Sequence, residues 1–143
     1  MTTHSADASE EERAALRAAR SHLVTLHKKL LDHERQRYER EHGQIETTHQ
    51  HWQLQMSHPM FAWLRPLSGL IARFDERLAA RAALTSTDAR QLAAEARELT
   101  TFAEERTEYQ EHYHRALETS PEILAVHSDV ARALSPLVAR ARS

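Results

Sequence analysis

The scarcity of glycine and proline is the feature that most limits how this chain can fold. Its 143 residues include two glycines and four prolines, whereas alanine, leucine, glutamate and arginine are abundant. Tight β-turns depend on glycine, and the abundant residues are strong helix formers. No run of alternating β-branched residues bounded by turn residues is present. The sequence therefore predicts an all-α fold.

Apolar residues recur at helical spacing in four long segments. The first begins after Ser9, which forms a capping box with Glu12, and ends at Gly43, a residue suited to a helix C-terminus. We expect an antiparallel four-helix bundle of up-and-down type, because these segments are joined by short connections. The expected helices are 10–42, 59–78, 88–118 and one from residue 121 onward, with a short extra helical segment around 49–56; residues 1–8 are expected to be a disordered tail and 9–143 a single domain.

Two prolines are expected to distort these helices. Pro66 lies in the most apolar and aromatic segment, residues 57–78, and lacks a backbone donor. The second helix should therefore kink there or break in two near Arg65. Pro136 should bend the last helix or end it at Leu134.

Charge and composition exclude several functional classes. The chain carries 21 acidic and 19 basic residues, with no basic stripe, so nucleic acid is not expected as a partner. No run of about 18 apolar residues occurs, and no leader segment is recognisable, so we expect no membrane partner and a cytoplasmic location. Cysteine is absent, and two glycines cannot build a phosphate-binding loop. Enzyme signatures are lacking, which favours a non-catalytic protein.

Polar side chains interrupt the apolar stripes of three helices. His27, Glu34, His114 and His127 are expected to face the bundle interior, accompanied by Tyr38, Arg106 and Gln110. The favoured interpretation is a buried polar network, for instance with Glu34 paired to Arg106. The alternatives are a transition-metal or haem site, since imidazole and carboxylate are metal ligands, and a small-ligand pocket. Against the ferritin type of metal site, the Glu111 to His114 spacing has no repeat on another helix.

An aromatic corner is the candidate interaction surface. Trp52, Phe61 and Trp63 lie close together in the sequence, and such side chains dominate binding energy where they are exposed. The alternative, that they are core residues, is preferred for Trp63. The first and third helices are longer than the others, and their overhanging apolar surface could be covered by a second copy. We therefore expect a non-catalytic, homodimeric binding protein with a protein or small-molecule partner; the alternative function is metal or haem binding.

Three segments, 26–43, 58–76 and 111–134, carry a family resemblance. They resemble a group of short, mostly uncharacterised bacterial proteins with an Arg-Tyr-Glu-Arg run that ends in His-Gly and a Pro-x-Phe-x-Trp-Leu-Arg-Pro-Leu-Ser core. The group often has Asp where this chain has His58. The resemblance implies an all-helical domain and brings no known activity. It rests on His27, Arg37, Tyr38, Glu39, His42, Gly43, Pro59, Phe61, 63–68, Tyr113, Leu117, Pro121 and His127.

Overall fold

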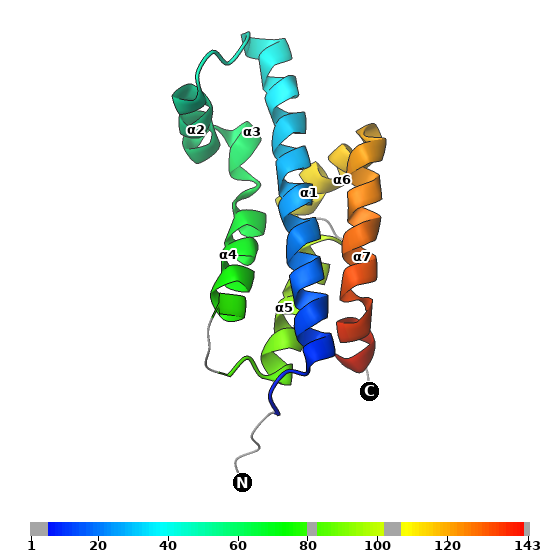
Figure 1. Cartoon of the computed structure of the whole chain (residues 1–143). Helices are drawn as coiled ribbons and strands as arrows, with labels where there is room; N and C mark the ends of the chain where they lie inside the picture. The colour runs from blue at the N-terminus through cyan, green and yellow to red at the C-terminus, as the bar shows by residue number, and fades with distance from the viewer. Residues whose placement is uncertain (1–5, 80–82, 102–106, 142–143) are drawn as a thin grey trace.

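The structure, a computed structural model, describes residues 6–79, 83–101 and 107–141, without the side chains of 139–141. The described residues contain seven helices and no strand longer than an isolated bridge, so the predicted all-α class is confirmed (Figure 1). The helices are α1 (Glu10–His42), α2 (Thr48–Ser57), α3 (Pro59–Ala62), α4 (Arg65–Ala79), α5 (Ser86–Leu99), α6 (Glu108–Thr119) and α7 (Pro121–Ala141).

Helix α1 begins and ends where its capping residues predict. Ser9 Oγ accepts a hydrogen bond from the Glu12 amide at 3.0 Å, and the Glu12 carboxylate accepts one from the Ser9 amide at 2.9 Å. Such caps stabilise a helix by about 1 kcal/mol. At the other end Gly43 has φ of 91°, a conformation that L residues rarely adopt, and the chain turns away from the helix axis there.

The second expected helix is divided, as the broken alternative predicted. Helix α3 ends at Ala62 and α4 starts at Arg65. Pro66 explains the break, because it has no N–H to donate and its ring would clash with the carbonyl of Ala62 in a continuous helix. The two helices can therefore take separate directions, and the short α2 precedes them close to the range expected for the extra segment.

The third expected helix, 88–118, was wrong as a single element. Helix α5 ends at Leu99, where Thr100 leaves the helical conformation and its hydroxyl donates to the carbonyl of Ala96 at 2.8 Å. Helix α6 starts after Thr107, which forms a capping box with Gln110. Threonine hydroxyls compete for backbone groups and favour helix ends over helix interiors. The expected stripe positions Phe102 and Ala103, and the predicted Glu34 partner Arg106, lie outside the described residues.

The last helix continues past Pro136 to Ala141, so it does not end at Leu134. Pro136 is exposed, while its neighbour Leu137 is fully buried. At the start of the chain, residues 6–8 form backbone hydrogen bonds with residues 84–86, and Ala8 is buried. This part of the expected tail is therefore attached to the helical domain.

The core lies where α1, α4, α5 and α7 pack side by side, whereas α2 stands apart at the C-terminal end of α1 (Figure 1). Leucines of α1 form its centre and are contacted from both sides by α4 and α7. None of the described helices has the length and apolar composition that crossing a membrane requires. Fully buried members of the core are Leu16, Leu23, Leu26, Leu30, Leu67, Leu70, Phe74, Val130 and Leu137.

Candidate functional site

Glu34 is the most completely buried charged side chain described, with 2% of its surface exposed. Its carboxylate lies 3.2 Å from Arg37 Nη1 and 3.8 Å from His33 Nδ1, both on α1. Burial raises the pKa of Glu34, and this effect outweighs the nearby positive charges of Arg37, His112 and Arg115. The sequence prediction that Glu34 faces the interior is thus confirmed, whereas its predicted partner Arg106 lies outside the described residues.

Trp63 connects this carboxylate to α6. Its ring stacks on His112, with centroids 5.2 Å apart and planes inclined by 15°, and meets Tyr109 edge to face at 5.4 Å. The indole N–H of Trp63 faces Glu34 and favours its ionised form, although no described acceptor lies within hydrogen-bonding geometry of that N–H. The Trp63 side chain therefore contacts the half-buried His112 ring through its face and approaches the buried Glu34 carboxylate through its N–H.

His112 was missed by sequence reasoning. It is two residues from His114, and such pairs point apart on a helix, so the spacing that turns His114 inward gives no reason to expect His112 to be covered as well. The two rings do have different neighbours, yet neither is fully solvated: His112 contacts Trp63, and His114 Nε2 lies 3.4 Å from the carbonyl oxygen of Thr101. The available signal was the spacing of His112 from Tyr109 and Ala116, which are buried on the same helix.

His114 and His127 lie near enough to each other to interact electrostatically. The Tyr113 hydroxyl lies 2.7 Å from Nδ1 of His127, and Tyr113 itself is fully buried. Burial lowers the pKa of His127, and the charge of His114 lowers it further. These three side chains form a second polar cluster at the junction of α6 and α7.

The four predicted metal ligands are distributed over different surroundings. Glu34 is held by Arg37 and the α6 side chains, while His114 and His127 surround Tyr113. His27 is half-buried, and burial alone lowers its pKa. Within residues 6–79, 83–101 and 107–141, no group of three or more His, Asp or Glu side chains is arranged to hold a metal ion. Gln110, predicted to join the inward network, instead caps α6 by accepting from the Thr107 amide.

Of the three predicted contact residues, only Trp52 presents its ring to solvent. Phe61 is 2% exposed and Trp63 is 7% exposed, so both belong to the interior. Phe61 is covered by the rings of Tyr38 and His51, at centroid distances of 5.9 and 5.6 Å. Trp52 is 56% exposed. The aromatic corner therefore divides into a buried part and a surface part.

The surface part is formed by α2. None of its ten residues is buried, and Met56 is exposed to nearly the same extent as Trp52. A shallow hollow of about 470 Å³ runs along the helix. We call the residues that line it the α2 patch: Gln50, Trp52, Gln53, Leu54, Met56 and Ser57.

A sequence signal for this patch was available and was missed. Between Glu46 and Arg65 there is no Asp, Glu, Lys or Arg, although such residues make up 28% of the chain. An exposed ten-residue helix without Asp, Glu, Lys or Arg differs from the longer helices, whose outer faces carry many charged side chains. Depletion of charge together with an exposed Trp and Met is typical of the centre of a protein interface.

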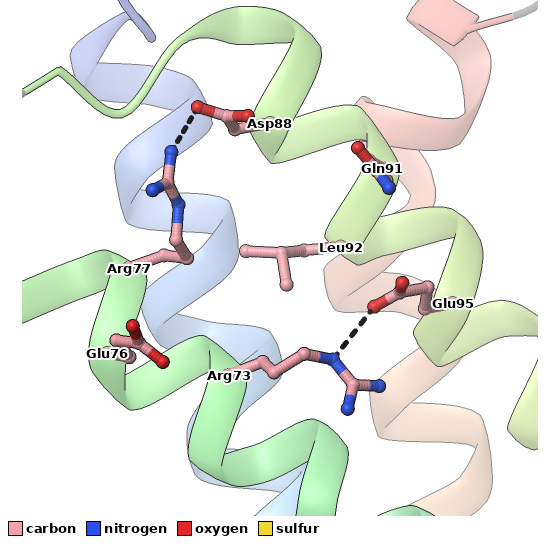
Figure 2. A pocket seen from close by; sticks show the side chains of 7 residues that line it. All are labelled: Arg73, Glu76, Arg77, Asp88, Gln91, Leu92 and Glu95. Carbon is pink, nitrogen blue, oxygen red and sulfur yellow. Dashed lines mark hydrogen bonds and ion pairs between the residues drawn. The ribbon is translucent and has the colours of Figure 1, made fainter.

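A second hollow, of about 260 Å³, lies between α4 and α5 (Figure 2). Figure 2 shows Arg77 paired with Asp88 and Arg73 paired with Glu95, on either side of Leu92; the Arg73–Glu95 distance is 3.3 Å. Hydrogen bonding from the Thr85 backbone lowers the pKa of Asp88, with Arg77 contributing. These ion pairs link the two helices across the hollow, so four of its six polar side chains are engaged with one another.

Comparison with protein-family models, with curated proteins and with solved structures gave no match. The resemblance to short bacterial helical proteins accordingly stays a prediction. What the chain does must be inferred from its own geometry.

Proposed function

We propose that this chain is a non-catalytic interaction protein that forms a homodimer through the α2 patch. One observation carries the proposal: α2 has no buried residue and holds Trp52 and Met56 more than half exposed. An isolated ten-residue helix is marginal in water. A helix that buries so little within its own chain gains stability when a partner covers it.

The composition of the patch fits a protein partner. Trp and Met are enriched at interface centres, and charged residues are depleted there. The polar members of the patch are Gln and Ser, which offer both donors and acceptors. Such a surface can exclude water without leaving an ion unpaired.

The partner favoured by these features is a second copy. A two-fold interface places the same surface on both sides, so any ion near the axis faces its own like charge. The segment 47–64 carries no Asp, Glu, Lys or Arg and therefore escapes this repulsion. Self-association through α2 brings two Trp52 rings and two Met56 side chains into one apolar contact.

The remaining expectations belong to the same proposal. Its scaffold is the antiparallel four-helix bundle expected from the sequence. In this arrangement α1 is the first bundle helix, α3 with α4 the second, α5 with α6 the third, and α7 the fourth. The proposal includes a cytoplasmic location and no nucleic-acid or membrane partner. It is supported by the mixed charge of the chain, with a formal net charge of −2.

The test is the mass of the protein in solution, measured by light scattering after size exclusion at neutral pH. We expect a dimer for the native chain and a monomer for the Trp52→Ala, Met56→Ala double variant. Leu124→Ala is the matched control, because Leu124 is an exposed apolar residue on α7, away from the patch. A native monomer, or a double variant that stays dimeric, overturns the proposal.

The second candidate function is binding of a transition metal or haem through His27, Glu34, His114 and His127. Its supporting observation is the proximity of His114 and His127. It is tested by metal analysis and visible absorption of untagged protein from cells supplied with iron, zinc and a haem precursor. Stoichiometric metal or haem that disappears in His127→Ala supports this function; metal-free, colourless, folded protein opposes it.

A further inference from the structure

Histidines surround the joint between α2 and the rest of the molecule. His58 is both the last cap of α2 and the first cap of α3: its amide donates to the carbonyl of Leu54 at 2.8 Å, and its Nδ1 accepts from the Met60 amide at 3.1 Å. The amides of Phe61 and Ala62 both donate to the His58 carbonyl at 3.0 Å. This single residue thus sets how α2 leaves α3.

The His58 ring is inserted against the C-terminal end of α1. Its centroid is 5.2 Å from that of Tyr38 and 5.8 Å from that of His42. On α2, His51 packs against Phe61, and its Nε2 is buried with no hydrogen-bond partner among the described residues. Three imidazoles from three different segments therefore meet around two aromatic rings.

The cap requires a neutral His58 ring. A backbone N–H can only donate, so Nδ1 must offer its lone pair to the Met60 amide. When Nδ1 carries a proton, the Nδ1–H and the Met60 N–H are two donors that face each other, and the hydrogen bond that caps α3 is lost. Histidine is the side chain whose charge ordinarily changes between about pH 5 and pH 8.

Other charged and titratable groups lie around the joint on α1, α2 and α4. On α1, Tyr38 is uncharged and His42 brings a second imidazole ring; Glu41 lies 3.8 Å from His42. On α2, the pKa of His51 is lowered, first by burial and then by the charge of Arg35. The charges of Asp32 and Glu39 oppose this shift without reversing it. From α4, Arg65 donates to the carbonyl of Met56 and brings a further positive charge close to the joint.

We propose that His58, supported by His42 and His51, is a pH-sensitive joint that holds α2 in place when neutral and releases it when protonated. The inference rests on the proposed function, because the α2 patch is the proposed dimer interface. When α2 is released, the patch is no longer held in the position in which a second copy binds it. The dimer is therefore stable at pH 7.5 and dissociates as the pH falls toward 5.5. Repulsion between protonated His42 and His58 acts in the same direction as the loss of the cap.

The key variant is His58→Asp. An aspartate caps a helix N-terminus and remains an acceptor throughout this pH range, because its carboxyl protonates near pH 4. His58→Asp should therefore keep the joint closed at pH 5.5. His22→Gln, at a half-buried position on α1 away from the joint, is the control for loss of a titrating histidine.

The experiment measures two quantities at pH 7.5 and 5.5: the dimer dissociation constant by sedimentation, and the amide hydrogen-exchange protection of α2 after correction for intrinsic rates. For the native chain we expect dimerisation to weaken and α2 protection to fall, each by about tenfold or more. Protection of α7 should stay constant. His22→Gln should behave like the native chain, and His58→Asp should show neither change.

The outcomes separate the two proposals. A dimer whose affinity and α2 protection are the same at both pH values overturns the joint and leaves the homodimer intact. A chain that is monomeric at both pH values, yet loses α2 protection at pH 5.5 only with His58 present, supports the joint and overturns the proposed function. Equal loss of protection in His58→Asp and in the native chain also overturns the joint.

Discussion

Two stretches of α1 are held by different kinds of contact. The longer N-terminal stretch, up to Leu30, buries Leu16, Leu23, Leu26 and Leu30 without exposure, and α4 and α7 pack on it. The C-terminal stretch, from Glu34 on, turns Glu34 inward and places Tyr38 among histidine rings. Apolar burial is insensitive to pH, whereas ionisable contacts are not. One helix therefore joins a stable core to a region whose stability depends on protonation.

The position of the proposed interface follows this division. Helix α2 lies at the polar end of α1, far along the helix from the leucine core (Figure 1). Segments with few buried apolar contacts open more easily than the core. A partner surface at this end can be changed without unfolding the rest of the molecule.

The largest expected effect is in the N-terminal stretch of α1, where the leucines are buried. Leu26→Ala should lower the free energy of unfolding by about 3 kcal/mol, because it removes a fully buried side chain and leaves a cavity. Val24→Ala is the matched control on the same helix, since Val24 is 38% exposed, and it should change stability by less than about 0.5 kcal/mol. Urea unfolding measures both. Equal losses would contradict the assignment of the core to this face of α1.

A smaller effect is expected where α6 meets α7. Tyr113→Phe should cost about 1–2 kcal/mol, because it deletes the hydroxyl that lies 2.7 Å from His127 Nδ1 in a buried site. Tyr38→Phe is the control: Tyr38 contacts its neighbours through its ring and is only partly buried. Thermal unfolding of the two variants compares the contributions. If Tyr38→Phe is the more damaging change, the contact between Tyr113 and His127 does not stabilise the fold.

The smallest expected effect on stability is at Glu34, and it depends on pH. Burial raises the pKa of Glu34, so the folded state favours the neutral carboxyl. The stability that Glu34 contributes is therefore complete below the ordinary carboxyl pKa and is lost as pH rises through the raised value. Glu34→Gln mimics the neutral form and should be between unchanged and about 1 kcal/mol more stable than the native chain at pH 7.

This difference should shrink as the pH falls toward 4.5, because the native carboxyl then becomes neutral too. Urea unfolding at several pH values measures it, with Glu98→Gln as the exposed control. A difference that grows at low pH would mean that the ionised carboxylate, paired with Arg37, is the favoured form.

The sequence was most informative where a local signal decides the structure. The ends of α1 follow from Ser9, Glu12 and Gly43, and the break before α4 follows from Pro66, since caps and proline act within one helical turn. The interruption between α5 and α6 was missed because apolar spacing continued through residues 88–118, while the competing signal of Thr100 and Thr107 is weak for each residue alone.

The candidate site shows the limit of periodicity more clearly. Helical spacing correctly predicted that Glu34 and His114 are buried, because a residue on the apolar face of a helix points toward the core. It could not name their neighbours, since these depend on which helices pack together. His112 was missed for this reason: α6 is contacted on more than one side, so rings that point apart are both covered.

The most direct test of the central claim, that the α2 patch is the dimer interface, is acrylamide quenching of tryptophan fluorescence over a range of protein concentrations at pH 7.5. The protein has two tryptophans, and Trp63 is buried, so quenchable emission reports mainly on Trp52. We expect quenching to decrease as the concentration rises through the dimer dissociation constant, because the partner covers the Trp52 ring. Dimer formation that leaves Trp52 equally quenchable would contradict the claim.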